Sequence, residues 1–373
     1  MIEKINSKKF YALGIMSGTS MDGVDASLIL TDGYEFCKVI HNVYSEYLDS
    51  TRANIIKIQE NFQDKVESQN EIDLLSRSLA IFNIEVIKPI FDFAEKNSIE
   101  IDVIGYHGQT VYHDPLNKIS IQIGDPQYLA NYFRTRVVFE FRSLDILNGG
   151  QGAPLTPIYH KAKFNKKLGY PYAILNIGGI SNLTYINHEE MIAFDAGPGN
   201  AMIDDLVRFA FKKKFDQEGK IASSGIINFE LVKGFMEDSY FKVGPPKSLD
   251  RNYFNKYIEL LSGDSKDKIA TASFFTVRSI IRSFEYFSEK PINIVICGGG
   301  SKNKFLIKQI AKYSKSNILL AEDLGYDSNF IEAEAFGFLA VRSLLKEPIS
   351  FPKTTGVKEP MCGGKVYEPS KSI

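Results

Sequence analysis

Apolar and polar positions follow two different periods along the chain. Short apolar runs at 10–16, 101–106 and 172–177 predict buried strands. Because strands and helices alternate in both halves, we expect an α/β protein. Apolar residues at helical spacing predict helices over 72–97, 200–215, 270–288, 301–314 and 328–346. We expect Pro89 to kink or break the first of these helices.

The pattern of the opening segment returns later in the chain. A strand, a glycine-rich polar turn and a second strand occupy 10–30, and the same order recurs over 172–186. This recurrence predicts two related lobes, an N-terminal one of residues 1–145 and a C-terminal one of residues 146–373. The stretch 142–157 is rich in Gly and Pro, which indicates a domain connection or a site loop. We expect the tail after Glu347 to run over the surface.

Composition and charge narrow the class of protein. The 373 residues carry 44 Lys and Arg against 45 Asp and Glu, so nothing indicates a general attraction for nucleic acid or for an anionic membrane. The three cysteines form no CxxC pair, which favours a reducing cytosol over a disulfide framework. The run 10–16 lacks a cleavage pattern, so we interpret it as a buried strand and not as a secretory signal. We see no apolar stretch long enough to span a bilayer.

The first glycine turn, residues 14–25, has the chemistry of a phosphate site. Its glycines let the backbone approach a ligand, and consecutive amides form an anion-binding concavity. Asp22 and Asp25 make sense near phosphate if a magnesium ion lies between, with Asp22 the stronger candidate. A tight hairpin with Asp as turn former is the alternative. The hydroxyl donors of this turn are Ser17, Thr19 and Ser20.

A further glycine turn follows the apolar run 292–297. Gly298, Gly299 and Gly300 leave a flat surface for a base or ribose, and the next helix offers free N–H groups. A plain strand-to-helix turn with Ser301 as N-cap is the alternative. The chain lacks a Walker A motif and a GxGxxG that opens a helix. The two glycine hairpins and this turn together are more specific than any one of them.

Polar residues follow two of the predicted strands. His-Gly-Gln-Thr at 107–110 comes directly after the run 101–106, so we expect a strand that ends in a polar loop. Asp195 follows the run 191–194. Side chains at the carboxyl ends of strands face the ligand site in open α/β sheets. For Asp195 the alternative is a turn or helix-start residue.

These segments resemble the anhydro-N-acetylmuramic acid kinases over nearly the whole chain. SGTSMDGVD and FDAGPGN are specific to that family, whereas the glycine turns are typical of the wider acetate-kinase, sugar-kinase and actin class. The matching segments are GIMSGTSMDGVD (14–25), GYHGQT (105–110), QIGDP (122–126), FRSLDILNGGQGAPL (141–155), NIGGISNL (176–183), FDAGPGN (194–200), PPKS (245–248), CGGGSKN (297–303) and EAEAFGFLA (332–340).

The resemblance implies a fold and a reaction. The fold is two related actin-like, ribonuclease H-like lobes with ATP in a central cleft. The reaction converts 1,6-anhydro-N-acetylmuramic acid, ATP and water into N-acetylmuramic acid 6-phosphate and ADP, in the recycling of cell-wall peptidoglycan. It also implies a bacterial cytoplasm and a homodimer.

The resemblance assigns roles to residues. Asp195 is the base that activates water, Asp22 holds or orients Mg²⁺ through water, and Lys247 is a cleft residue of unknown role. Arg142 suits the lactyl carboxylate of the sugar. The expected ATP-binding set is Gly14, Ser17, Gly18, Thr19, Ser20, Met21, Asp22, Gly178, Gly179, Ser181, Asn182, Gly298, Gly299, Gly300 and Asn303. The expected sugar-binding set is His107, Gln109, Thr110, Arg142, Asp145, Gln151 and Glu332.

Two departures from the family concern the choice of sugar more than the ATP chemistry. Leu249-Asp250-Arg251 replaces a Thr-Gly-Arg run, and Ile146-Leu147-Asn148 replaces small residues. Two alternatives therefore stay open. One is a sugar or anhydrosugar kinase of the same class with another substrate. The other is a nucleotide-dependent binding or assembly protein.

Overall fold

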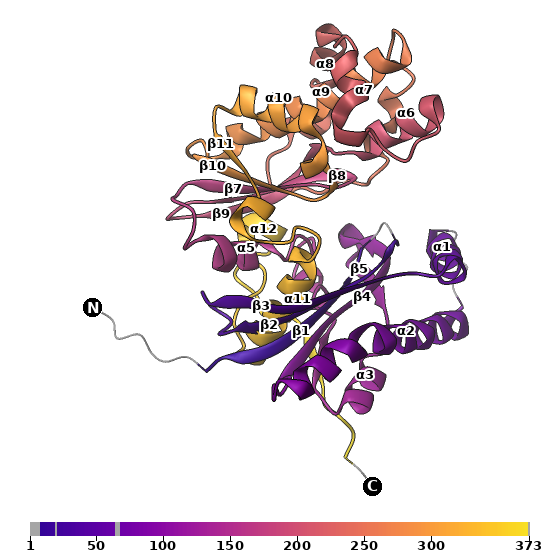
Figure 1. Cartoon of the computed structure of the whole chain (residues 1–373), viewed down its shortest axis with the longest axis vertical. Helices are drawn as coiled ribbons and strands as arrows, with labels where there is room; N and C mark the ends of the chain where they lie inside the picture. The colour runs from indigo at the N-terminus through magenta and orange to yellow at the C-terminus, as the bar shows by residue number, and fades with distance from the viewer. Residues whose placement is uncertain (1–7, 19–20, 64–67, 372–373) are drawn as a thin grey trace. The chain divides into compact units, whose positions relative to one another are not determined.

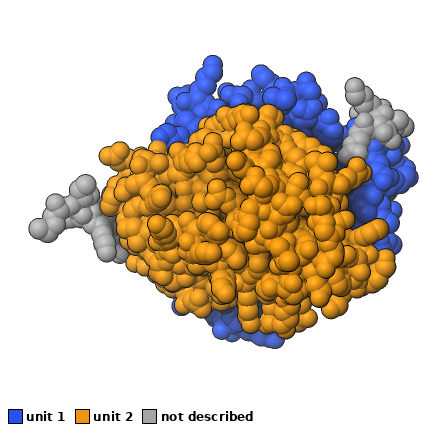
Figure 2. Space-filling view, turned by 90° about the horizontal axis from the view of Figure 1, so that it is seen from above, with its two compact units in different colours: residues 1–164, 329–373 blue, residues 165–328 orange. Residues whose placement is uncertain are grey.

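The chain folds into two compact units. A computed structural model describes residues 8–18, 21–63 and 68–371 (Figure 1). One unit comprises Met1–Phe164 and Asn329–Ile373, and the other comprises Asn165–Ser328 (Figure 2). The expected division after residue 145 is therefore displaced. The C-terminal segment returns to the first unit because helix α11 packs on strands of that unit's sheet.

The sheet of the first unit combines antiparallel and parallel strands. Three strands form an antiparallel meander, two more join it in parallel, and the last strand adds an antiparallel edge. A further strand pairs with the end of β4. In spatial order the strands are β3 (Cys37–Glu46), β2 (Gly23–Thr31), β1 (Phe10–Ser17), β4 (Val103–Asp114), β6 (Val137–Phe139) and β12 (Lys365–Tyr367), with β5 (Ile119–Ile123) beside β4.

The sheet of the second unit repeats this arrangement. Three antiparallel strands are again followed by two parallel ones. The α/β class and the two related lobes are thus confirmed, because the strand order and direction match over both sheets. In spatial order the strands are β9 (Met191–Pro198), β8 (Ile180–Ile186), β7 (Tyr172–Ile177), β10 (Asn293–Cys297) and β11 (Asn317–Leu320).

The long expected helices are present in both units. Helix α2 does not break at Pro89, because Pro89 and Glu85, whose carbonyl an amide at position 89 would have met, lie on the exposed face. In the first unit the helices are α1 (Asp49–Gln63), α2 (Gln69–Lys96), α3 (Pro126–Phe133), α4 (Ser143–Leu147), α5 (Pro157–Phe164), α11 (Ile331–Leu344) and α12 (Pro352–Thr355). In the second they are α6 (Ala201–Phe211), α7 (Lys220–Ser224), α8 (Phe229–Phe235), α9 (Ser265–Ser283) and α10 (Lys304–Ser314).

Two glycines let helix α11 lie directly on the first sheet. A Cβ at Gly14 would come 1.8 Å from the Ala333 carbonyl oxygen, and one at Gly105 would come 2.1 Å from that of Phe336. Side chains alternate along a strand, so Leu13 and Ile15 point to the other face and join the core beneath α2. Gly14 was expected to bind ATP; its contact in the structure is with α11.

The tail after Glu347 does not run over the surface, as was expected, but packs into the first unit. Ile349, Thr355 and Val357 are buried, and β12 extends the first sheet. The apolar side chains of this segment and its strand pairing hold it against the first unit, which a count of Pro and Gly does not reveal.

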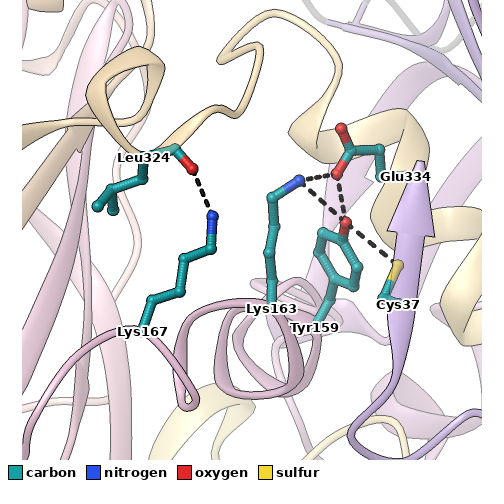
Figure 3. Close-up of polar contacts among 6 residues, drawn as sticks. All are labelled: Cys37, Tyr159, Lys163, Lys167, Leu324 and Glu334. Carbon is teal, nitrogen blue, oxygen red and sulfur yellow. Dashed lines mark hydrogen bonds and ion pairs between the residues drawn. The ribbon is translucent and has the colours of Figure 1, made fainter.

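A buried polar cluster links β3, α5 and α11 within the first unit (Figure 3). The Lys163 and Glu334 side chains form an ion pair and are 3% and 1% exposed. The Tyr159 hydroxyl donates to the same Glu334 oxygen, and the Cys37 thiol donates to the Tyr159 oxygen over 3.7 Å. Burial raises the pKa of Cys37 to about 12, so its thiol stays protonated. The contact from Lys167 to the Leu324 carbonyl, also drawn there, belongs to the second unit.

Candidate functional site

The first glycine hairpin connects β1 to β2. Thr19 and Ser20 lie outside the described residues. The Met21 amide donates to the Gly18 carbonyl over 3.2 Å, and Met21 has a φ of 57°, which closes the turn. The Asp22 carbonyl accepts from the Tyr47 amide over 3.0 Å, while the Asp22 residue itself is exposed. The backbone therefore fixes Asp22, and solvent can reach its carboxylate.

Asp25 lies inside β2 and not in the hairpin turn. It pairs in register with Met16 and is half-buried. This position agrees with the structural alternative for Asp25 and leaves Asp22 as the stronger magnesium candidate. Across the described ranges, no group of three or more His, Cys, Asp or Glu side chains is placed to hold a metal ion.

Ser17 and Gln109 tie the ends of the neighbouring strands β1 and β4. The Ser17 hydroxyl donates to the Gly108 carbonyl over 3.1 Å, and Gln109 Nε2 donates to the Gly18 carbonyl over 3.1 Å. Gln109 is buried, and its Oε1 has no hydrogen-bond partner in the part of the chain that the structure describes. A buried acceptor without a donor costs about 1–3 kcal/mol, so this oxygen is suited to receive a donor from a ligand.

The His-Gly-Gln-Thr segment is part of a strand and not a loop, which corrects the expectation. Strand β4 continues to Asp114, because β5 folds back and pairs with residues 109–114. Thr110 Oγ1 accepts from Gln122 Nε2 of β5 over 3.3 Å. The polar side chains therefore have fixed directions on a strand, which positions a site more accurately than a loop does.

His107 is held in one tautomer by its two neighbours. Its Nδ1 lies 2.7 Å from the Gly108 carbonyl, which can only accept, so Nδ1 carries the proton. Nε2 then accepts from Arg142, whose Nε and Nη2 lie at 3.2 and 2.9 Å. Burial, and secondarily the charge of Arg142, hold the pKa of His107 well below its ordinary value. His107 is therefore neutral at physiological pH and orients Arg142.

Arg142 begins the loop 142–157, which the structure places in the first unit as a folded loop beside β4. Arg142 Nη1 donates to the Gly152 carbonyl over 2.7 Å. Burial lowers the pKa of Arg142 to about 10, and the Glu332 carboxylate in the first turn of α11 opposes this shift most, followed by Asp145. Arg142 therefore stays charged near neutral pH. Glu332 retains access to solvent.

Asp145 organises this loop from within. Its two carboxylate oxygens accept from the Gly152 amide over 2.6 Å and from the Thr355 hydroxyl over 2.5 Å. A Cβ at Gly150 would come 2.1 Å from the same carboxylate, so the loop closes only with glycine there. The Gln151 amide donates to the Thr355 carbonyl over 2.7 Å. These contacts position Arg142 rather than present Asp145 to a ligand.

The second glycine hairpin connects β7 to β8 in the second unit. The Gly178 and Gly179 carbonyls accept from the amides of Asn200 and Gly199 over 2.8 and 3.0 Å. The hairpin is thereby packed against the start of α6. The Ser181 hydroxyl is buried and donates to the Pro198 carbonyl over 2.9 Å, so it supports the hairpin from below.

Asp195 lies within β9, opposite Asn182 of β8. Its Oδ2 accepts from the Leu249 amide over 2.8 Å, and its own amide donates to the Lys247 carbonyl over 3.0 Å. Asp195 is half-buried, and loss of water around the carboxyl raises its pKa to about 7 against the opposing Leu249 hydrogen bond. Asp195 makes no ion pair with a described residue. Such a carboxylate can exchange a proton near neutral pH.

Lys247 has its role assigned by its contacts. Its ammonium group donates to the Tyr240 and Val243 carbonyls over 3.1 and 2.8 Å. Burial, and next the charge of Arg282, lower the pKa of Lys247 to about 8. Lys247 thus holds the segment that contacts Asp195. The Lys247 carbonyl fixes the Asp195 backbone, and the Leu249 amide fixes the Asp195 carboxylate.

The glycine turn after β10 opens beside a pocket of about 220 Å³. Gly298 has a φ of 76°, and a Cβ there would come 2.1 Å from Asn176 Oδ1. Helix α10 begins at Lys304, and the Asn303 side chain caps it by accepting from the amides of Phe305 and Leu306 over 3.1 and 3.2 Å. Asn303, and not Ser301, is therefore the N-cap. The pocket is lined by Asn200, Asp204, Phe215, Gly299 and Asn303, among others.

The structure groups the expected residues into two sets. In the first unit Ser17, Gly18, His107, Gln109 and Arg142 are joined by hydrogen bonds. In the second unit Gly178 adjoins Asn200, which reaches the pocket beside Gly299. Sequence reasoning missed Asp204 and Phe215; the former lies four residues after the FDAGPGN segment, which was the available signal.

Comparisons with known proteins agree over almost the whole chain. A family model described as "Anhydro-N-acetylmuramic acid kinase" matches residues 10–369. A protein of that description from Pelagibacter ubique is 38% identical over 372 residues, covering 96% of this chain and 98% of the relative. One from Zymomonas mobilis is 40% identical over 364 residues, covering 95% and 99%.

Solved structures show a more distant likeness. A ROK family glucokinase from Streptomyces griseus, solved with glucose and AMPPNP, is 10% identical with a TM-score of 0.42, covering 88% of this chain and 99% of that chain.

Among the described residues, no helix combines the length and the apolar character that a membrane-spanning segment needs.

Proposed function

The chain belongs to the anhydro-N-acetylmuramic acid kinase family, and we propose on that premise that it converts 1,6-anhydro-N-acetylmuramic acid, ATP and water into N-acetylmuramic acid 6-phosphate and ADP. The observation that carries the mechanism is Asp195. Its carboxylate makes no ion pair with a described residue, and burial raises its pKa to about 7. That value suits a general base that works at neutral pH.

Asp195 takes the role of base for the attacking water. The water oxygen bonds to the anomeric carbon while one of its protons passes to Asp195, and the bond from that carbon to O6 breaks. The freed O6 then bonds to the γ-phosphorus and ADP leaves, which demands positioning and charge neutralisation more than covalent help. The Leu249 amide and the Tyr240 hydroxyl, which donates to the Asp195 carbonyl, hold the base in place.

The glycine hairpins are assigned to the phosphates of ATP. The Met21 and Gly178 amides already donate to the Gly18 and Ile180 carbonyls and so close the hairpins, while the amides of Gly18 and Gly179 are the proposed phosphate donors. Thr19 and Ser20 add hydroxyls. Gly14 and Ser181 contribute indirectly, by packing, as their contacts indicate. The pocket beside Gly299 takes the adenosine, with Asn303 in its lining and Gly298 and Gly300 in the same turn. Asn182 lies in β8 beside the second hairpin and is assigned to the phosphate end.

Magnesium fits the exposed carboxylate of Asp22. A hard cation that retains several waters needs only one or two carboxylates from the protein. Asp22 is fixed by its backbone and faces solvent at the phosphate hairpin, so it would hold the ion through water. When bound, Mg²⁺ supplies neutralisation of the phosphate charge.

The first unit supplies the expected sugar contacts. Arg142, oriented by neutral His107, is placed to pair with the lactyl carboxylate. Gln109 Oε1 offers an unfilled acceptor, and Thr110 and Glu332 are further polar contacts. Asp145 and Gln151 hold the loop that carries Arg142.

The wider setting follows from the family. We assign the protein to peptidoglycan recycling in a bacterial cytoplasm, as a homodimer that binds neither nucleic acid nor a membrane. Equilibrium sedimentation tests the dimer directly.

The reaction is tested by ADP release with purified protein, Mg²⁺ and ATP. We compare 1,6-anhydro-N-acetylmuramic acid with free N-acetylmuramic acid and with no sugar, in the wild type, in Asp195→Asn and in Asp92→Asn, an exposed control on α2. Only the anhydro sugar should stimulate release, and only Asp195→Asn should abolish it. Preference for a free sugar would favour a kinase that needs no water, and indifference to sugar would favour a binding or assembly protein.

A further inference from the structure

The pocket beside Gly299 is continuous with the second glycine hairpin through Asn200. The Asn200 amide donates to the Gly178 carbonyl over 2.8 Å, and Asn200 Nδ2 donates to the Ile177 carbonyl over 3.0 Å. The same residue lines the pocket. A nucleotide whose phosphates lie at the hairpin can therefore place its uncharged end in this pocket.

Three carboxylates line the pocket, and two of them are already occupied. Asp216 accepts from the amides of Ile221 and Ala222 over 2.8 and 2.9 Å. Glu218 pairs with Lys220 and Lys304 over 3.0 and 3.2 Å. These contacts fix the pocket wall and engage both oxygens of each of these two carboxylates.

The third carboxylate, Asp204, has no such partner. It lies in the first turn of α6, and its side chain forms no hydrogen bond and no ion pair with a described residue. The adjacent Asp205 instead takes both nearby arginines, Arg208 and, over 3.8 Å, Arg251. Burial raises the pKa of Asp204 to about 6, with Arg208 as the main opposing charge, so it is mostly ionised at neutral pH.

The chemistry of the pocket selects the kind of group that Asp204 would meet. A carboxylate only accepts hydrogen bonds and repels phosphate, so the group that it meets must present donors, and the uncharged end of a nucleotide presents neutral ones. Two adjacent hydroxyls of a ribose do this, and an acidic side chain is a known partner for a ribose hydroxyl in other nucleotide sites. Phe215, which is 57% exposed, lines the same pocket and offers an aromatic face to a base.

We propose that Asp204 accepts hydrogen bonds from the ribose hydroxyls of the bound nucleotide, while Phe215 stacks on its base, so that this pocket selects ribonucleotides over deoxyribonucleotides. The inference rests on the proposed use of ATP and adds two specificity-determining residues to it. Asp204 acts on binding and is separate from the proton transfer at Asp195.

The test measures dissociation constants by calorimetry for ADP, 2′-deoxy-ADP and 3′-deoxy-ADP. A hydrogen bond to a charged group predicts that the wild type binds ADP at least about 10-fold more tightly than the weaker of the deoxy analogues. Asp204→Ala should lose this preference by weakening ADP more than either deoxy analogue, since each analogue keeps only one of the two hydroxyls, and Asp204→Asn should retain part of the preference. Asp205→Asn, a neighbouring carboxylate outside the pocket lining, should keep the preference.

The variant Phe215→Leu tests the stacking of Phe215 on the base separately from the ribose contact of Asp204. Loss of the aromatic face should weaken ADP and both deoxy analogues by the same factor, of about 5- to 10-fold. Thermal melting of each variant shows whether it folds, and the isosteric Asp204→Asn keeps the test valid if Asp204→Ala does not.

The outcomes separate this inference from the proposed function. Sugar-dependent turnover together with equal affinity for ADP and its deoxy analogues would overturn the ribose assignment alone. A preference that survives Asp204→Ala would do the same. If the variant instead loses discrimination between ADP and IDP, Asp204 reads the amino group of the base, and the ribose assignment is wrong. Failure of the wild type to bind any nucleotide would overturn both proposals.

Discussion

Glu334 in the first unit is a fully buried carboxylate and Asp195 in the second is a half-buried one, and the groups around them differ. Glu334 receives a lysine ammonium and a tyrosine hydroxyl on one oxygen. Asp195 Oδ2 receives a backbone amide, from Leu249, and Asp195 makes no ion pair with a described residue. The first carboxylate is neutralised by a partner, whereas the second is left with a pKa raised to about 7.

The difference teaches how burial can serve stability or chemistry. A buried charge that is paired with an opposite charge stays ionised, and removal of either partner leaves the other as an uncompensated buried charge. A desolvated carboxylate without a cation gains and loses a proton near neutral pH, which is the property of a general base. The following changes should separate the two cases.

Asp195→Asn should have the largest effect. Removal of the base should lower kcat for the anhydro sugar by about 10²–10⁴-fold, as measured by ADP release. Thermal stability should not fall, because the amide replaces a carboxylate that burial disfavours. A variant with kcat within a few-fold of the wild type would show that another group activates the water.

Lys163→Met should have the opposite profile. It leaves Glu334 buried without its cation, so urea unfolding should show a loss of about 3–5 kcal/mol. The double variant Lys163→Met with Glu334→Leu should recover much of this loss, since no charge then remains buried. Equal stability of the single and double variants would contradict the stranded-charge explanation.

The pH dependence of kcat and of folding stability should both show the raised pKa of Asp195. Since Asp195 must be ionised to act, kcat should fall about tenfold per pH unit below about 7. For folding the sign is reversed: a raised pKa stabilises the protein below the unfolded value of about 3.9, and this contribution is lost as the pH rises through about 7. Asp195→Asn should therefore gain stability over the wild type between these values. A flat difference across pH 4–8 would contradict the assignment.

Arg142→Lys should have the smallest of these effects. Arg142 is a buried cation held by a neutral histidine, which makes it intermediate between the two cases. Loss of the guanidinium fork should raise KM for the anhydro sugar about 10-fold, with a smaller change in kcat. Initial rates at varied sugar concentration measure this, with the exposed Arg134→Lys on the same unit as a control. An unchanged KM would remove Arg142 from the sugar-binding set.

Local sequence determined most of the elements and the turns between them. The apolar runs at 10–16, 172–177 and 292–297 became β1, β7 and β10, because a short run that is apolar throughout and is followed by a glycine turn is typical of a strand buried on both faces. The glycines of the two hairpins also stood where the backbone turns. What local sequence could not supply was the continuation of β4 through His-Gly-Gln-Thr, which depends on pairing with β5.

Tertiary structure decided what individual polar residues do. Asp145, Asp195 and Asp204 are alike in the sequence but differ in their contacts. The Asp145 carboxylate accepts hydrogen bonds that hold its own loop, and the Asp195 carboxylate is desolvated beside the Leu249 amide. The Asp204 carboxylate lines a pocket. Gly14 likewise sits in a phosphate-type motif and contacts α11. The family and its reaction were thus readable from the sequence, since they depend on residue types in fixed segments. The role of each carboxylate depends on burial and on donors brought from distant segments, and those exist only in the folded chain.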